Sequence, residues 1–188
     1  MKVFINPGHD VDFDSGACGF GLRECDVALE IGLLVQKYLE AAGCEVKLLQ
    51  SDNLLEDTDY PQERPVAVVE EANAWPADVF VSIHCNAAAD DSAHGTEVLA
   101  YSNENTSEGA RLAGFIQSQI VDALGTTDRG VKARPGLIVL KHTDMPAALV
   151  EMAFISNEAD NALLRDNQDD FARAIARGVT DYECELTN

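Results

Sequence analysis

Three apolar runs in this sequence each end at a residue that can bind a metal ion or transfer a proton. These residues are His9, His84 and Glu151. Imidazole nitrogens are common zinc ligands, and a carboxylate can accept and return a proton during hydrolysis. If the runs are neighbouring parallel strands, the three side chains meet at one edge of a sheet, where open α/β sheets bind their ligands. The pattern therefore predicts a catalytic site.

A catalytic zinc site uses three protein ligands and leaves a position for water. His9 and His84 would supply two ligands. Glu24 is the candidate for the third, because it lies where a Gly-rich loop meets the first long helix. A single loop histidine is usually solvated or structural, but two histidines at equivalent strand ends favour a metal site. Cys18 and Cys25 are weaker alternative ligands, since free cysteines usually pack as small apolar side chains.

Glu151 lies between two apolar segments, where burying a carboxylate is costly unless it has a cationic partner or a function. The alternative to catalysis is an ion pair with Arg129 or Lys132, and a neighbouring metal centre favours catalysis. His142 lies in the connection before Glu151 and is a second-rank candidate for electrophilic assistance. His94 lies in a polar loop, so we expect a solvated side chain there.

Segments typical of strands alternate with segments of helical periodicity along the chain. We expect strands at residues 3–6, 45–49, 79–83, 95–101, 137–140 and 147–150. We expect helices at residues 25–42, from Pro61 to just before Trp75, at 107–124, after Asn157, and at 168–183. This order predicts an α/β fold with a largely parallel or mixed sheet of about six strands and helices on both faces. With no repeat or linker, residues 1–188 are expected to form a single domain.

The charge of the chain excludes some partners. Lys and Arg total 13 against 33 Asp and Glu, a formal net charge of −20. Such a surface repels nucleic acid and anionic lipid, so we expect neither as a partner. No stretch approaches the roughly 18 apolar residues that span a bilayer. The N-terminus enters a strand without the features of a secretory signal, which leaves the export route open. The five scattered cysteines do not indicate a disulfide framework.

Short segments of the chain follow the order of one family's motifs over nearly its whole length. They are Asn6-Pro7-Gly8-His9-Asp10; Gly16-Ala17 with Gly21 and Glu24; Arg64, Ala72-Asn73 and Ala77-Asp78; Ser82-Ile83-His84-Cys85-Asn86-Ala87; Gly95–Val98; Arg129–Lys132; and Met145–Asn157. With these segments the sequence resembles the zinc-dependent N-acetylmuramoyl-L-alanine amidases. That family includes bacterial wall-remodelling amidases and phage endolysins.

The resemblance implies a role for each main candidate. His9, Glu24 and His84 would bind one zinc ion, and Glu151 would be the catalytic carboxylate. The implied reaction is hydrolysis of the amide between N-acetylmuramic acid and the L-alanine of the peptidoglycan stem peptide. Residues 1–188 would then be a single catalytic amidase domain, a monomer that acts at the cell wall on peptidoglycan or muropeptides.

Two residues depart from the family pattern. Asn6 stands in place of the usual acid, and Asp10 in place of the usual glycine. We expect Asn6 to weaken the orientation of His9, because an amide accepts a hydrogen bond less strongly than a carboxylate. Asn86 and His142 are candidates for contact with the substrate, from their positions alone.

Two other functions remain open. One is a zinc peptidase that cuts within the stem peptide, since specificity depends on groove contacts that motifs do not reveal. The other is a catalytically silent wall-binding module with the same fold. The presence of all three candidate ligands and of Glu151 argues against the silent module, and the motif order argues against the peptidase. The sequence does not separate a host autolysin from a phage-type lysin.

Overall fold

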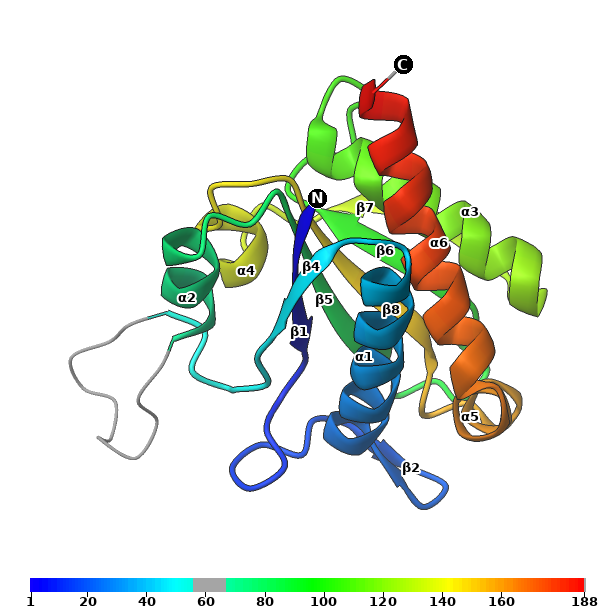
Figure 1. The fold of residues 1–188 in the computed structure, drawn as a ribbon. Coiled ribbons are helices and arrows are strands. Elements are labelled where there is room, and N and C mark those ends of the chain that lie inside the picture. Colours follow the sequence, from blue (N-terminus) through cyan, green and yellow to red (C-terminus); the bar gives the residue numbers. More distant parts are fainter. Residues whose placement is uncertain (56–66, 188) are drawn as a thin grey trace.

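A six-stranded sheet forms the centre of the computed structural model, which describes residues 1–55 and 67–187 (Figure 1). Its strands are β1 (Lys2–Pro7), β4 (Glu45–Leu48), β5 (Val79–Asn86), β6 (Thr96–Ala100), β7 (Asp128–Ala133) and β8 (Ala147–Phe154). They lie in the order β4-β1-β5-β8-β6-β7. Neighbouring strands are parallel except β6 and β8, which are antiparallel. The predicted α/β class with a mixed, mostly parallel sheet is confirmed.

Helices cover both faces of this sheet (Figure 1). In the described part they are α1 (Glu24–Ala41), α2 (Val68–Ala74), α3 (Glu108–Leu124), α4 (Ile138–Lys141), α5 (Glu158–Asp166) and α6 (Gln168–Thr187). Apolar residues of α1, α3 and α6 pack on one face, and those of α2 and α4 pack on the other. None of these helices is both long and apolar enough to cross a membrane.

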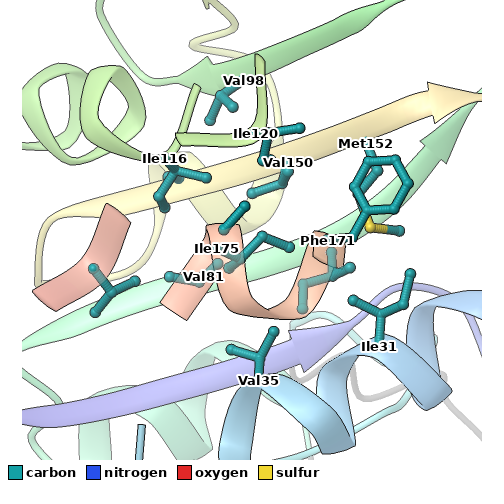
Figure 2. Packing of buried hydrophobic residues seen from close by; sticks show 14 of the residues in the cluster. Ile31, Val35, Val81, Val98, Ile116, Ile120, Val150, Met152, Phe171 and Ile175 are labelled. Carbon is teal, nitrogen blue, oxygen red and sulfur yellow. The ribbon is translucent and has the colours of Figure 1, made fainter. Parts of the chain in front are cut away.

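The strands that carry the candidate site are held by a tightly packed core. Figure 2 shows Val81 of β5 and Val150 of β8 packed among Ile31 of α1, Ile116 of α3 and Phe171 of α6. All five side chains are fully buried. Burying one such side chain contributes about 1.5–3 kcal/mol. The backbone at the carboxyl ends of β1, β5 and β8 is therefore fixed by the core, which makes that edge a rigid platform.

One predicted strand is wrong, and one strand of the six-stranded sheet was not predicted. The apolar run at residues 137–140 belongs largely to the short helix α4, where Val139 and Leu140 are buried against the second face of the sheet. So short an apolar run suits a buried helix turn as well as a strand. The sixth strand is instead β7, an edge strand of mostly half-buried residues that pairs with β6. Its polar residues do not give the apolar pattern of a central strand.

The loop expected between β1 and the first helix contains a small hairpin. It consists of β2 (Cys18–Gly19) and β3 (Leu22–Arg23). Phe20 and Gly21 form its turn, and both have positive φ, +44° and +85°. Two central residues with positive φ match the twist of a tight hairpin. The predicted start of a helix at Pro61 and the motif residue Arg64 lie outside the described residues, and that helix ends at Ala74 as expected.

Candidate metal centre and active site

His9, Glu24 and His84 converge at the carboxyl edge of β1 and β5. His9 follows β1, His84 lies in β5, and Glu24 is the first residue of α1. Oε1 of Glu24 lies 3.1 Å from Nε2 of His9 and 2.9 Å from Nδ1 of His84. One donor atom from each residue lies within 4.8 Å of the other two. Two imidazoles and one carboxylate form a ligand set of the kind found in catalytic zinc sites.

Two glycines provide the space that the ligand side chains occupy. A Cβ atom on Gly8 would overlap the ring of His84. A Cβ atom on Gly16 would lie 2.6 Å from both Oε2 of Glu24 and the ring of His9, and Gly16 has φ +63°. Any larger residue at either position would displace a ligand. The donor set and the glycines that enclose it therefore fit a metal ion.

Glu24 is held in its orientation by the backbone. Its Oε2 accepts a hydrogen bond from the N–H of Ala17 at 2.9 Å, and its Oε1 accepts one from the N–H of Cys85 at 3.0 Å. Burial alone would raise the pKa of Glu24, but hydrogen bonds from His84 and His9 outweigh burial and hold the pKa well below its usual range. Glu24 is therefore an ionised, preorganised ligand.

His9 has a second carboxylate on the other side of its ring. Oδ2 of Asp14 lies 2.7 Å from Nδ1 of His9. Burial alone would lower the pKa of His9, but the hydrogen bonds with Glu24 and Asp14 raise this pKa to about 9. Without a metal, His9 thus carries a proton at neutral pH. A metal that binds Nε2 must displace a proton, so metal affinity depends on pH.

A short loop positions Asp14. The backbones of Asp10 and Asp14 exchange two hydrogen bonds, of 2.8 and 3.1 Å. Oδ1 of Asp10 accepts the N–H of Asp12 at 2.9 Å, the pattern of an Asx turn. Asp10, which departs from the family pattern, thus builds the loop that presents Asp14 to His9. Asp14 is not among the residues predicted from the sequence, although two acids at the ends of a five-residue loop directly after a candidate ligand are a signal for it.

Asn6 does not hydrogen-bond to the ring of His9 and so does not set its orientation. Its side-chain amide donates to the carbonyl of Leu49 at 3.0 Å and accepts from Oγ of Ser82 at 2.9 Å. It is 1% exposed and fastens β1 to its surroundings. The expectation that Asn6 weakens the orientation of His9 is therefore wrong, because Asp14 is the residue that contacts the His9 ring.

Glu151 lies beside the metal centre. It is the register partner of His84 in the parallel pair of β5 and β8, and the register shifts directly after this pair. Oε2 of Glu151 is buried and has no hydrogen-bond partner among the described residues. Burial raises the pKa of Glu151 to about 7. The ion pair considered as an alternative is not formed by Arg129, whose Nε donates to Oε2 of Glu97 at 2.9 Å. A carboxyl group of this kind is suited to proton transfer near neutral pH.

The four residues surround one end of a cavity of about 460 Å³. Asn86 also lines this cavity, and its Nδ2 donates to Oε1 of Glu97 at 3.1 Å. His142 does not line it. The carbonyl of His142 accepts from Nδ2 of Asn73 at 3.0 Å, and its side chain is exposed before the start of β8. The cavity therefore gives no support for His142 as a substrate contact, and that role stays a prediction.

The other weak candidates lie outside the metal centre. His94 is exposed, and its Nδ1 contacts the carbonyl of Ser92 at 2.8 Å, as expected for a solvated loop residue. Cys18 is exposed and Cys25 is buried, and neither belongs to the cluster of donor atoms found in the described part.

Known proteins resemble this chain in sequence and in structure. The sequence model of a family described as N-acetylmuramoyl-L-alanine amidase matches residues 3–181. The N-acetylmuramoyl-L-alanine amidase LytC of Bacillus subtilis is 40% identical over 183 residues, which are 96% of this chain and 35% of LytC. The chain thus spans about a third of that relative. The endolysin of Bacillus phage SPP1 is 34% identical over 193 residues, covering 99% of this chain and 66% of the endolysin.

Two solved structures share the fold. The N-acetylmuramoyl-L-alanine amidase AmiC2 of Nostoc punctiforme superposes with a TM-score of 0.81 at 34% identity, covering 98% of this chain and 97% of AmiC2. The catalytic domain of CwlV from Bacillus (Paenibacillus) polymyxa superposes with a TM-score of 0.81 at 31% identity, covering 97% and 98% of the two chains.

Proposed function

Because the chain belongs to the family of N-acetylmuramoyl-L-alanine amidases, we propose that it hydrolyses the amide between N-acetylmuramic acid and the L-alanine of the stem peptide. The observation that carries this proposal is the placement of Glu151 in register with His84, beside a His–Glu–His cluster. Peptidoglycan is the substrate and the cell wall is the place of action. Residues 1–188 act as one catalytic unit.

The metal in this proposal is one zinc ion held by His9, Glu24 and His84. The donor set, the ionised state of Glu24 and the space left by Gly8 and Gly16 support it. Zinc at this position would lower the pKa of water and polarise the amide carbonyl, which is otherwise resistant to hydrolysis at neutral pH.

Side chains of the protein transfer the proton, orient a metal ligand and contact the substrate. Glu151 accepts the proton of the attacking water and returns it to the nitrogen of the departing L-alanine. A carboxyl group with a pKa of about 7 can perform both transfers near neutral pH, because neither form is strongly favoured. Asp14 holds the ring of His9 through Nδ1, and Asn86 provides an amide on the cavity wall for contact with the substrate.

The direct test is digestion of purified cell wall followed by identification of the new chain ends. The proposed reaction releases stem peptides with a free L-alanine amine and produces no new reducing sugar ends. The Glu151→Gln variant, assayed beside the wild type, shows whether the release depends on this site. New amino termini at other stem residues would indicate the peptidase instead, and binding without any release would indicate the silent wall-binding module.

A further inference from the structure

The cavity beside the metal centre runs away from it along one face of the sheet. Glu151 and Leu149 of β8 point to this face, because alternate residues of a strand share a face. In the neighbouring antiparallel strand β6, Glu97 pairs with Glu151 and Leu99 pairs with Leu149. All four side chains line the cavity. The cavity thus passes from a polar end at the metal centre to an apolar floor made by two leucines.

Arg134 lies beyond this apolar floor. It follows the last residue of β7, and its backbone N–H donates to the carbonyl of Ala100 at 2.8 Å. Ala100 is three residues further along β6 than Glu97, a distance of about 10 Å at the rise of an antiparallel strand. Arg134 is exposed and lines the same cavity as Glu151. Its long side chain therefore spans part of the distance between Ala100 and the metal centre.

Arg134 differs from the other arginines in the described part of the chain. Each of the others forms an ion pair with a carboxylate; these arginines are Arg23, Arg111, Arg129, Arg165, Arg173 and Arg177. Among the described residues, the side chain of Arg134 has a single hydrogen bond, from Nη1 to the carbonyl of its neighbour Ala133 at 3.0 Å. In a chain this rich in acidic residues, a guanidinium without an acidic partner in the described part is unusual.

Two of the three carboxylates that line the cavity are already engaged, and the third, Glu151, lies at the metal end, where its Oε2 has no hydrogen-bond partner among the described residues. Glu97 pairs with Arg129 and accepts from Asn86, and Glu24 contacts both histidines. Arg134 is also the cavity's sole Lys or Arg among the described lining residues. Its guanidinium is therefore available for an anionic group that enters with the substrate.

We infer that Arg134 binds a free carboxylate on the stem-peptide residue that follows L-alanine. This inference rests on the proposed function. With the scissile amide at Glu151 and His84, the methyl group of L-alanine lies over Leu99 and Leu149. At roughly 3.5 Å per residue, the next residue of an extended peptide spans from about 3.5 to about 7 Å from the cut amide, toward Arg134. A guanidinium matches a carboxylate with two parallel hydrogen bonds, whereas a primary amide lacks the charge.

The experiment uses the zinc-loaded protein and soluble glycan fragments that carry stem peptides in two forms. The forms differ only in a free carboxylate or a primary amide on the α-carbon of the second peptide residue. We compare kcat/KM on both forms for the wild type, Arg134→Ala, Arg134→Lys and Arg177→Ala. The last variant is the matched control, because Arg177 lies on α6, on the opposite face of the sheet.

The wild type should cleave the carboxylate form about tenfold more efficiently, the low end for a charge-assisted hydrogen bond because the guanidinium is exposed. Arg134→Ala should lose this preference through slower cleavage of the carboxylate form alone. Arg134→Lys should keep part of it, and Arg177→Ala all of it.

If the wild type has no preference, or if Arg134→Ala keeps it, the inference is overturned while cleavage of both forms still supports the amidase proposal. If the wild type releases no stem peptide from either form, the proposed function itself fails, and the inference fails with it.

Discussion

Asp14 and Glu24 hold the ring of His9 from opposite sides, with Oδ2 of Asp14 2.7 Å from Nδ1 and Oε1 of Glu24 3.1 Å from Nε2. A proton shared between Nδ1 and Asp14 leaves Nε2 directed at the metal position. A carboxylate behind a ligating histidine fixes the tautomer and increases the basicity of the ligand. Asp14 is therefore a positioning residue for the metal centre, although it touches neither of the other two ligands.

Replacing Asp14 with Asn should weaken zinc binding by about 10- to 100-fold, the effect typical of losing such a carboxylate. Competition titration with a chromophoric chelator measures the change. Asp12→Asn is the control, since it removes the same charge from the same loop without contacting His9. Equal affinities for the two variants would show that Asp14 acts only through its charge or not at all.

Replacing Glu151 with Gln should reduce turnover by at least about 100-fold while leaving the zinc content unchanged. The amide keeps the shape of the side chain but cannot accept the proton of water. Stem-peptide release from purified wall gives the rate, and metal analysis of the same sample gives the occupancy. Activity close to that of the wild type would mean that another group is the base.

The same substitution should change how the stability of the metal-free protein depends on pH. The pKa of Glu151 is about 7 in the folded state, against an ordinary value of 4.5. Between these values the folded protein keeps a proton that the unfolded chain has lost, so stability falls as pH rises through this window. At about 1.4 kcal/mol per pKa unit, the loss is on the order of 3 kcal/mol by pH 8.

Glu151→Gln lacks this titration, so its unfolding free energy relative to the wild type should increase between pH 5 and pH 8. Urea unfolding of both proteins at several pH values, with a chelator present, measures the difference. Both proteins retain His9 and Glu24, so the difference between them isolates the titration of Glu151 together with its electrostatic coupling to these two residues. A difference that stays constant with pH would contradict the prediction.

Replacing Gly8 with Ala should abolish detectable zinc binding at micromolar metal, because the added methyl group occupies the position of the His84 ring. Gly114→Ala is the control. A Cβ atom there has nothing within 4 Å, and the exchange lies inside α3, where it should stabilise the protein by roughly 0.5–1 kcal/mol. Isothermal titration with zinc and thermal unfolding of both variants test the pair. Normal zinc affinity in Gly8→Ala would mean that His84 is not confined as described.

The placement of His9, His84 and Glu151 at one sheet edge could be predicted because the strands before them are central. A central strand of a parallel sheet is covered on both faces and must be almost wholly apolar. A polar residue that interrupts such a run is therefore conspicuous, but His84 and Glu151 lie inside β5 and β8, which continue to Asn86 and Phe154 instead of ending where the apolar runs end. The convergence of Glu24 with the two histidines is confirmed, whereas the catalytic role of Glu151 stays a prediction.

What could not be predicted depends on contacts that are formed only in the folded chain. β7 is an edge strand, so Asp128 and Lys132 need not be apolar, and it resembled a loop. Residues 137–140 gave the pattern of a strand, yet their burial is completed by one helical turn. The contact of Asp14 with His9 depends on the turn that the side chain of Asp10 stabilises. The spacing of the motif residues does not reveal that turn.

The residues proposed for hydrolysis and the residue proposed for peptide selection lie on different parts of this domain. His84 and Glu151 are kept together by the hydrogen bonds of two central strands, so changes in the surrounding loops do not alter their spacing. Arg134, in contrast, sits in the short connection between β7 and α4. If Arg134 selects the stem peptide as we infer, exchanging that connection should redirect the domain to walls with different stem peptides, while the strands that carry His84 and Glu151 stay untouched.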